Sequence, residues 1–554
     1  YLQHLILNPF IMQKILFNIF LLFISTQLFS QNNIYTHQDT LRGSITKERI
    51  WWDLKHYDLN IKVNPELKFI SGKNNIKYEV LQSYQIMQID LQEPMKITKV
   101  IQGDSTLNFN KEGYSYFIQL KNEQIIGDQN QLTVFFEGKP IIAKRPPWDG
   151  GLTWGKDING LDFIATSCQG DGASLWWPCK DHMYDEPENM AINITTPNHL
   201  IDVSNGRLKS VTENNDNTKT YHWYVTNPIN NYGVNMNIGD YTHFSEKYEG
   251  EKGTLDCDYY VLKGNLKKAK KQFKDVKKML QAFEHWFGPY PFYEDSFKLV
   301  EVPYLGMEHQ SSVTYGNQYK NGYLGSDLSG TGWGLKFDFI IIHESGHEWF
   351  ANSITYKDIA DMWIHESFTA YSESLFLDYH YGTKARNEYV IGTRLNILND
   401  IPIIGDYNVN NAGSGDMYYK GANMLHTLRQ LLEDDNKWRD ILRGLNKEFY
   451  HQTVTTEQIE NYLSLHTKID LTAFFNQYLR SIRVPTLEYK ISNKKLNFRW
   501  INVVEDFDMP VKTYLNSTEK WIFPTKEWKE LINDSVISKF KIDKNFYVES
   551  TYIN

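Results

Sequence analysis

The stretch Ile341-Ile-His-Glu-Ser-Gly-His347 decides how this chain folds, because its spacing is that of a metal-binding helix. Residues four apart lie on one face of a helix, so His343 and His347 can direct both imidazoles at one metal ion. Glu344 is turned about 100° around the helix axis and stands beside that ion. The motif therefore predicts a metal centre with a carboxylate next to it.

Glu366, in the segment Trp363-Ile-His-Glu-Ser-Phe368, follows the motif after eighteen further residues. It can provide a third ligand from a following helix, and this set leaves a fourth tetrahedral position open to water. An open position is typical of catalytic zinc, so we expect one Zn²⁺ ion held by His343, His347 and Glu366. Glu373, seven residues further, is expected either to orient a ligand or to be an exposed surface carboxylate.

The residues around the motif are apolar, with Ile340-Ile-Ile342 before its first histidine and Trp349-Phe350 after its second. This pattern predicts a buried helix with an inward-facing polar patch, in which Trp349 and Phe350 continue the apolar run. The alternative is an ordinary helix with two histidines at the edge of the core. The carboxylate of Glu366, where a third ligand is needed, favours the metal site.

With 554 residues, the chain is too long for one core, and we expect two to four domains. Its net charge of -9 argues against a nucleic-acid partner. The Lys-rich stretch 267–278 contains apolar positions at helical spacing, among them Phe273, Val276 and Leu280. It therefore predicts an amphipathic helix with a solvated basic face rather than a binding patch.

Near the N-terminus, Met12-Gln-Lys14 precedes an apolar run over 15–29. This pattern resembles a secretory signal, and we expect a signal peptide over residues 1–30 in which 1–11 are an extension upstream of an initiator Met12. The run is about fifteen residues long, short of the roughly twenty that a membrane span needs. We therefore expect export to the periplasm or beyond, with an uncleaved membrane anchor as the alternative. No later segment predicts a membrane span.

The chain has three cysteines, Cys168, Cys179 and Cys257, so at least one is unpaired. We expect buried thiols, although Cys168 and Cys179 could pair after export.

The hydrophobic period changes twice along the chain, which predicts a multidomain α+β protein. Period-two segments occur at 57–63, 75–80 and 131–136, helical patterns dominate from residue 262 with one strand at 297–302, and period two returns at 486–491, 496–500 and 540–543. We expect an N-terminal β-sheet domain over 31–250, a mainly α catalytic domain over 251–484 and a small C-terminal β-sandwich over 485–554.

Two further motifs, Tyr304-Leu-Gly-Met-Glu-His309 and Tyr418-Tyr-Lys-Gly-Ala422, accompany the zinc signature. With them, the chain from about Trp51 onward resembles the zinc aminopeptidases of the gluzincin clan, the family of aminopeptidase N and leukotriene hydrolase. The resemblance implies a thermolysin-like catalytic domain. It also implies peptide substrates with free N-termini.

The first of these motifs is similar to the Gly-x-Met-Glu-Asn exopeptidase motif of that family, which implies that Glu308 binds the substrate α-amino group. A carboxylate near zinc can pair with an N-terminal ammonium and fix the first peptide bond over the metal. Gly306 and Met307 would line the substrate, with the strand at 297–302 as the edge along which it lies. His309 replaces the family's Asn, so it could alter how substrate is held and leaves the preferred residue open.

The remaining implied roles concern catalysis. Glu344 is placed to take a proton from water and later hand it to the leaving amine. The Tyr-x-Lys-Gly resemblance implies that Tyr418 stabilises the oxyanion, and Lys420-Gly421 distinguishes it from the neighbouring Tyr419. Thr166-Ser-Cys-Gln169 resembles the segment where the N-terminal domain enters the cleft, and by that match Gln169 would contact the first substrate residue.

These observations predict a zinc-dependent aminopeptidase. One alternative is a thermolysin-like endopeptidase, which would have no use for Glu308. Another is a catalytically inactive peptide-binding protein on the same fold, which would be expected to have lost a ligand, the base or the tyrosine. Epoxide hydrolysis, known in part of the family, is a further possibility that nothing in the sequence favours. The sequence does not indicate an oligomeric state.

Overall fold

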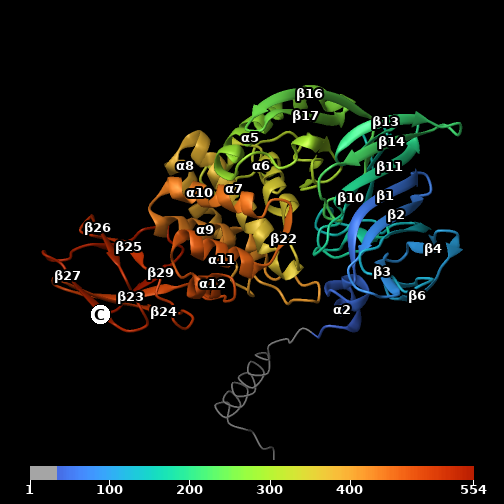
Figure 1. Ribbon diagram of the computed structural model, residues 1–554. Helices are drawn as coiled ribbons and strands as arrows, with labels where there is room; N and C mark the ends of the chain where they lie inside the picture. Colours follow the sequence, from blue (N-terminus) through green and yellow to red (C-terminus); the bar gives the residue numbers. More distant parts are fainter. Residues whose placement is uncertain (1–33) are drawn as a thin grey trace, which may run out of the picture.

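The computed structural model describes residues 34–554, so the predicted signal peptide at 1–30 lies outside the described residues. The N-terminal β-sheets and the C-terminal strands lie at opposite ends of the molecule, with a helical domain between them (Figure 1). This arrangement confirms the predicted multidomain α+β class. Within residues 34–554, no helix is both long and apolar enough to cross a membrane.

An eight-stranded sheet, of order β13-β14-β11-β1-β2-β8-β4-β5, forms most of the N-terminal domain. Side chains alternate along β1, where Leu59 and Ile61 are buried and their neighbours are more exposed. The predicted strands at 57–63, 75–80 and 131–136 lie within β1, β2 and β8 and are confirmed. The strands are β1 (Trp52–Asn64), β2 (Phe69–Val80), β4 (Lys96–Gln102), β5 (Ser105–Thr106), β8 (Gln129–Gly138), β11 (Asn189–Pro197), β13 (Arg207–Glu213) and β14 (Thr218–Val225).

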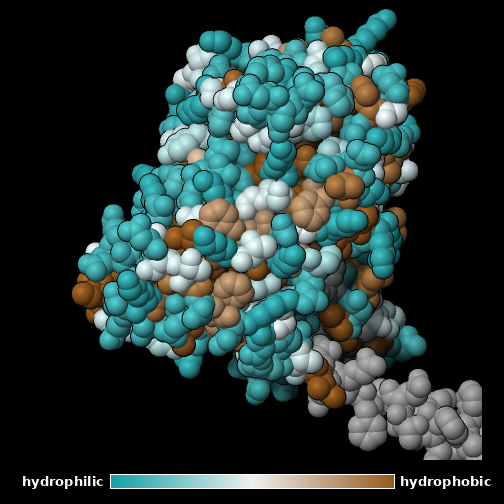
Figure 2. All heavy atoms as spheres, turned by 90° about the vertical axis from the view of Figure 1, so that its right-hand side faces the viewer, coloured by the Kyte–Doolittle hydropathy of each residue, from teal (hydrophilic) through white to brown (hydrophobic). Residues whose placement is uncertain are grey.

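Two smaller sheets complete this domain, with orders β12-β15-β10-β9 and β3-β7-β6. The chain leaves β10 at Ser167, two residues before Gln169. The outer face of the domain is mainly hydrophilic, with hydrophobic residues scattered among polar ones (Figure 2). The strands are β3 (Ile86–Asp90), β6 (Asn108–Glu112), β7 (Ser115–Gln119), β9 (Gly151–Lys156), β10 (Asp162–Ser167), β12 (Ile201–Val203) and β15 (Asn237–Gly239).

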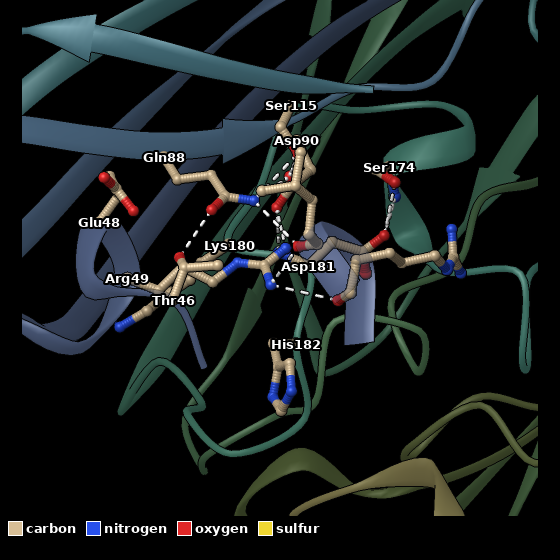
Figure 3. A network of polar contacts seen from close by, with 12 residues as sticks. Thr46, Glu48, Arg49, Gln88, Asp90, Ser115, Ser174, Lys180, Asp181 and His182 are labelled. Atoms are coloured by element: carbon tan, nitrogen blue, oxygen red, sulfur yellow. Dashed lines mark hydrogen bonds and ion pairs between the residues drawn. The ribbon is translucent and has the colours of Figure 1, made fainter. Parts of the chain in front are cut away.

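The first described helices, α2 (His37–Gly43) and α3 (Lys47–Ile50), are held against this domain by the buried Arg49. Its Nη2 atom lies 2.6 Å from Asp90 Oδ2 (Figure 3), and its Nη1 atom donates to the Leu41 and Ser44 carbonyl oxygens at the end of α2. A buried guanidinium is stable only with such partners. The contacts therefore tie the N-terminal segment to the sheet.

A five-stranded sheet of order β16-β17-β18-β20-β19 connects the N-terminal domain to the helices. Because it begins at Tyr241, the predicted boundary at residue 250 falls at the turn between its first two strands. The predicted strand at 297–302 is β18, but β18 lies between β17 and β20, so the expectation that it is an edge strand is wrong. The edge strands of this sheet are β16 and β19, and the short strand β19 follows the turn over residues 302–305. The strands are β16 (Tyr241–Gly250), β17 (Gly253–Leu262), β18 (Phe297–Glu301), β19 (Gly306–Met307) and β20 (Val313–Tyr315).

Helices make up most of the catalytic domain. The Lys-rich stretch 267–278 is divided between α4 and α5, which meet at the buried Phe273, so the predicted amphipathic character is confirmed but the helix is not continuous. The helices are α4 (Leu266–Gln272), α5 (Lys274–Phe287), α6 (Phe339–Gly346), α7 (Trp363–Tyr381), α8 (Thr383–Gly392), α9 (Tyr419–Leu432), α10 (Asp435–Glu448), α11 (Thr456–Thr467) and α12 (Thr472–Tyr478). A two-stranded sheet of β21 (Ile354–Tyr356) and β22 (Gln452–Val454) lies beside them.

The motif helix α6 is shorter than its apolar flanks predict. It ends at Gly346 with His347 as its C-cap, and in the π-helical turn that follows Phe350 leaves helical geometry with φ -122° and ψ 80°. Trp349 and Phe350 continue the buried apolar run, as expected, but they lie in the π-helical turn after α6. The turn brings the Phe350 carbonyl oxygen to 3.0 Å from His347 Nδ1, so the chain reverses to hold that imidazole.

The C-terminal domain consists of two small sheets, of orders β27-β24-β23-β29 and β26-β25-β28. Leu487, Trp500 and Val511 are among its buried side chains, and they belong to the same hydrophobic core as the catalytic helices. The strands predicted at 486–491, 496–500 and 540–543 are confirmed. The strands are β23 (Thr486–Ser492), β24 (Lys495–Ile501), β25 (Val511–Leu515), β26 (Thr518–Ile522), β27 (Lys529–Ile532), β28 (Phe540–Ile542) and β29 (Glu549–Tyr552).

The three cysteines are buried and free, as expected, and Cys168 and Cys179 are not paired.

Candidate active site

His343 and His347 on α6 and Glu366 on α7 converge in the interior of the catalytic domain. Oε2 of Glu366 lies 3.8 Å from His343 Nε2 and 3.4 Å from His347 Nε2. All three side chains are buried. Gly346 permits this approach, since a Cβ there would lie 2.7 Å from Ser372 Oγ on α7. The two helices therefore bring one ligand atom from each residue to a common point.

The hydrogen bonds of these residues fit a cation at that point. Nδ1 of His343 is 2.8 Å from Glu373 Oε1, and Nδ1 of His347 is 3.0 Å from the Phe350 carbonyl oxygen. Each Nδ1 can therefore carry the ring proton, which leaves both Nε2 lone pairs free for a metal. Oε2 of Glu366 is buried and has no hydrogen-bond partner among the described residues. A metal ion would satisfy all three atoms.

Electrostatics also favour a cation here. Burial acts against a charge on His347, but the carboxylates of Glu366, Glu308 and Glu344 raise its pKa to about 10. Without a metal ion, the site therefore stabilises a positive charge on an imidazole. The same field would favour a bound metal cation.

Glu373 is fully buried, so the alternative of an exposed surface carboxylate is wrong. Its Oε2 accepts a hydrogen bond of 2.6 Å from the Tyr389 hydroxyl group, while its Oε1 faces His343. Glu373 therefore orients the first histidine, as the spacing predicts.

A cavity of about 240 Å³ opens in front of these ligands. Glu344 and Glu308 both line it, and ligand atoms of Glu308, Glu344 and His347 lie within 4.8 Å of one another. The cavity therefore combines two further carboxylates with the metal ligands. Its walls are formed by Pro147, Trp148, Gln169, Leu305, Gly306, Met307, Glu308, Tyr323, Phe339, Ile340, His343, Glu344, His347, Glu366, Tyr418 and Tyr419.

Glu344 has the properties of a general base. Burial raises its pKa to about 7, with the Glu308 carboxylate acting in the same direction and the two histidines against it. A carboxylate with a pKa near neutrality can both accept and return a proton. Its position in the cavity wall fits the predicted role.

Glu308 directly follows the edge strand β19. The Glu308 carbonyl oxygen accepts a hydrogen bond of 2.8 Å from Asn352 Nδ2, and its carboxylate Oε1 accepts one of 3.1 Å from the Tyr232 hydroxyl group. Gly306 allows this strand to approach the motif helix, because a Cβ there would lie 2.6 Å from Ile340 Cγ2. Gly306, Met307 and Glu308 all line the cavity, as predicted.

Both Tyr418 and Tyr419 line the cavity, but different carboxylates act on their phenols. Burial raises the pKa of both phenols; the carboxylate that acts most strongly on Tyr418 is Glu366, whereas for Tyr419 it is Glu373. Tyr418 is also stacked on His343, with ring centroids 6.0 Å apart. The Tyr418 phenol is therefore protonated, and its ring lies against one of the candidate metal ligands.

The absence of a side chain at Gly421 allows Tyr418 to lie beside the candidate metal ligands. A Cβ on Gly421 would lie 1.9 Å from Ser367 Oγ on α7. Ser367 in turn donates a hydrogen bond of 2.7 Å to the Met417 carbonyl oxygen, just before Tyr418. Helix α9 therefore begins in close contact with the turn that carries Glu366.

Two predicted substrate-binding residues lie differently from the rest. Gln169 lines the cavity, and its Nε2 atom donates a hydrogen bond of 3.0 Å to Glu366 Oε1. Gln169 therefore orients the third ligand.

His309 is not part of the cavity wall; it is fully buried behind the edge strand, with Nδ1 3.3 Å from Thr314 Oγ1. The expected role for His309 in holding the substrate is wrong, because its side chain is buried beside Thr314 and does not reach the cavity wall.

Sequence reasoning missed several residues of the site. Tyr232 and Asn352 hold Glu308, Phe339 stacks on His343 with centroids 5.1 Å apart, and Trp148 lies at the mouth of the cavity. Tyr232 and Trp148 come from loops far away in the sequence that carry no motif. Only the position of Phe339, four residues before His343, could have indicated a contact.

Comparisons with known proteins agree with this geometry. The model of the Peptidase M1 N-terminal domain matches residues 54–232, and that of the Peptidase family M1 domain matches residues 271–478. The chain belongs to peptidase family M1. The two matched regions of this M1 chain contain every residue of the site described above: Pro147, Trp148, Gln169 and Tyr232 lie in the N-terminal region, and the others lie in the catalytic region.

Relatives of this M1 chain are distant in sequence. "Probable aminopeptidase 1" of Sulfurisphaera tokodaii is 19% identical over 466 residues, which is 78% of this chain and 56% of that protein. "Leukotriene A-4 hydrolase" of Xenopus laevis is 24% identical over 323 residues, covering 55% of this chain and 50% of that protein. The chain spans about half the length of these curated relatives.

Among solved structures, an M1 zinc metallopeptidase variant from Deinococcus radiodurans, bound to a Tyr-Ser-Ala substrate, aligns with a TM-score of 0.65 at 19% identity. The alignment covers 79% of this chain and 96% of that one. This similarity confirms the fold of the M1 chain.

Proposed function

We propose that this chain is a zinc-dependent aminopeptidase that releases the N-terminal residue of peptides. The observation that carries the proposal is the position of Glu308 in the same cavity as Glu344 and the candidate metal ligands, with ligand atoms of Glu308, Glu344 and His347 within 4.8 Å of one another. A substrate ammonium paired with Glu308 would hold the first peptide bond beside the general base. The names of relatives such as "Probable aminopeptidase 1" support the same activity.

His343, His347 and Glu366 would hold one Zn²⁺ ion. When bound, this ion supplies Lewis-acid polarisation of the substrate carbonyl and activation of water. Glu344 takes a proton from the attacking water and hands it to the leaving amine. The Tyr418 phenol donates a hydrogen bond to the oxygen on which negative charge develops.

The proposal is tested with short peptides that have either free or acetylated N-termini, each with and without a chelator. Release of single residues from the free peptides alone, abolished by the chelator and restored by zinc, is the expected result. Cleavage of the acetylated peptides would instead indicate an endopeptidase. No cleavage of either would indicate a peptide-binding protein.

Glu308→Ala provides the second part of the test. Loss of the carboxylate should reduce cleavage of free-amine peptides by about 10²-fold or more, because an ion pair with the ammonium is lost in a buried site. The thermal unfolding temperature serves as the control for folding. An unchanged rate would remove Glu308 from amine recognition.

A further inference from the structure

A chain of three buried hydrogen bonds leads to the carboxylate of Glu308. The backbone N–H of Tyr356 donates to His365 Nε2 at 2.9 Å. His365 Nδ1 lies 3.4 Å from the Tyr232 hydroxyl oxygen, and that hydroxyl group donates to Glu308 Oε1 at 3.1 Å. All four side chains are buried, so water does not replace these contacts.

The backbone donor determines which atom donates and which accepts in every hydrogen bond of this series. Because the N–H of Tyr356 can only donate, His365 Nε2 must be the acceptor nitrogen, and a neutral imidazole then carries its proton on Nδ1. That N–H is directed at the Tyr232 oxygen, so the Tyr232 hydroxyl group is left to donate to Glu308. Each donor in the series is therefore determined by the one before it.

The residues of this series come from separate parts of the fold. Tyr232 lies in the loop between β14 and β15 of the N-terminal domain, His365 lies on α7 next to Glu366, and Tyr356 ends β21. His365 is also held by stacking on the Tyr356 ring, with centroids 4.2 Å apart. The carboxylate of Glu308 is thus oriented by both domains.

We propose that Tyr232 and His365 are positioning residues for amine recognition: they hold one oxygen of Glu308 so that its other carboxylate oxygen meets the substrate ammonium. The inference rests on the proposed aminopeptidase function. Neither residue touches the reacting bond in this scheme. Their loss should weaken binding of the amine while leaving the proton transfer by Glu344 in place.

The test compares two probes, the tripeptide Leu-Gly-Gly and its des-amino analogue 4-methylpentanoyl-Gly-Gly, as competitive inhibitors of the zinc-loaded enzyme. The wild-type enzyme should bind Leu-Gly-Gly more tightly. Tyr232→Phe, which removes one hydroxyl group, should reduce this preference by about tenfold, mostly through weaker binding of Leu-Gly-Gly. The KM of a free-amine substrate should rise by a similar factor, with kcat changed much less.

Tyr462→Phe is the matched control. Its buried hydroxyl group donates to the Ile441 carbonyl oxygen at 3.0 Å and is remote from the cavity. It should lower the unfolding temperature about as much as Tyr232→Phe without changing the preference between the two probes. If Tyr232→Phe also leaves the preference unchanged, the positioning role is overturned. If the wild-type enzyme shows no preference, the proposed function fails as well.

Two variants of His365 separate positioning from a general structural role. Asparagine can place an amide N–H near the position of Nδ1, whereas glutamine can place an acceptor near Nε2. His365→Asn should therefore retain the preference for Leu-Gly-Gly, and His365→Gln should lose it, with zinc content measured in both. The opposite order, or equal loss in both, would overturn the role of His365.

Discussion

Nδ1 of His343 lies 2.8 Å from Oε1 of Glu373, and the Tyr389 hydroxyl group holds the other oxygen of that carboxylate at 2.6 Å. This arrangement fixes the imidazole before any metal binds. It also keeps the ring proton on Nδ1, so that Nε2 is ready to act as a ligand.

Glu373→Gln should therefore weaken zinc binding by about 10- to 100-fold, because the amide is a poorer partner for the imidazole N–H. Competition with a chromogenic chelator measures this affinity directly. Glu457→Gln, at an exposed position on α11, is the control and should bind zinc as the wild type does. Equal affinities for Glu373→Gln and wild type would contradict the orienting role.

Glu344→Gln should retain zinc and lose turnover by about 10²- to 10⁴-fold, since the amide cannot accept the proton of the attacking water. Zinc content by elemental analysis and rates on a free-amine peptide check both parts. Substantial remaining activity would show that another group is the base.

Tyr418→Phe should lower kcat by about 10²-fold or more, because the oxyanion loses a hydrogen-bond donor while the ring still stacks on His343. Tyr419→Phe is the matched comparison, since the pKa of the neighbouring phenol responds most, among the carboxylates, to Glu373 rather than to Glu366. A larger loss for Tyr419→Phe would reverse the assignment of the two tyrosines.

His182 predicts a pH dependence of stability that is separate from catalysis. It is buried, its Nδ1 accepts from the Tyr184 N–H at 3.3 Å, and its Nε2 lies 3.2 Å from the Gly43 carbonyl oxygen at the end of α2. Burial, aided by the Arg49 charge, lowers its pKa to about 3. The folded state therefore favours the neutral ring.

Because the folded pKa lies below the unfolded value of about 6.5, the contribution of His182 is fully present above that pH and is lost as the pH falls toward 3. At pH 5, the loss should be about 2 kcal/mol. His182→Gln removes the titrating group, so its free energy of unfolding should fall less between pH 7 and pH 5 than that of the wild type. Urea denaturation at both pH values measures the difference, and equal falls would contradict the prediction.

The parts of the site that could be predicted are those with short-range spacing. His343 and His347 lie four residues apart on one helix, and Glu373 follows Glu366 by two turns of another, so helical geometry alone places each pair on one face. Strands with alternating apolar residues, such as those within β1 and β24, were predictable for the same reason.

Contacts that depend on how separate segments pack could not be predicted in this way. The strand at 297–302 is expected to be an edge strand, yet it lies between β17 and β20, because strand order depends on pairing between distant segments. His309 is expected beside the substrate, but its side chain is buried beside Thr314, a contact that depends on how the segment after β19 packs on β20.

The sequence by itself determined the candidate metal ligands, the candidate base and the change from β to α to β along the chain, because local spacing and periodicity set which side chains share a face. Only the tertiary structure decided that Gln169 reaches Glu366 and that Tyr232 and His365 hold Glu308. These hydrogen bonds join residues 197, 76 and 133 positions apart in the sequence. They depend on the close packing of the N-terminal domain against α7 and β19, which no local pattern encodes.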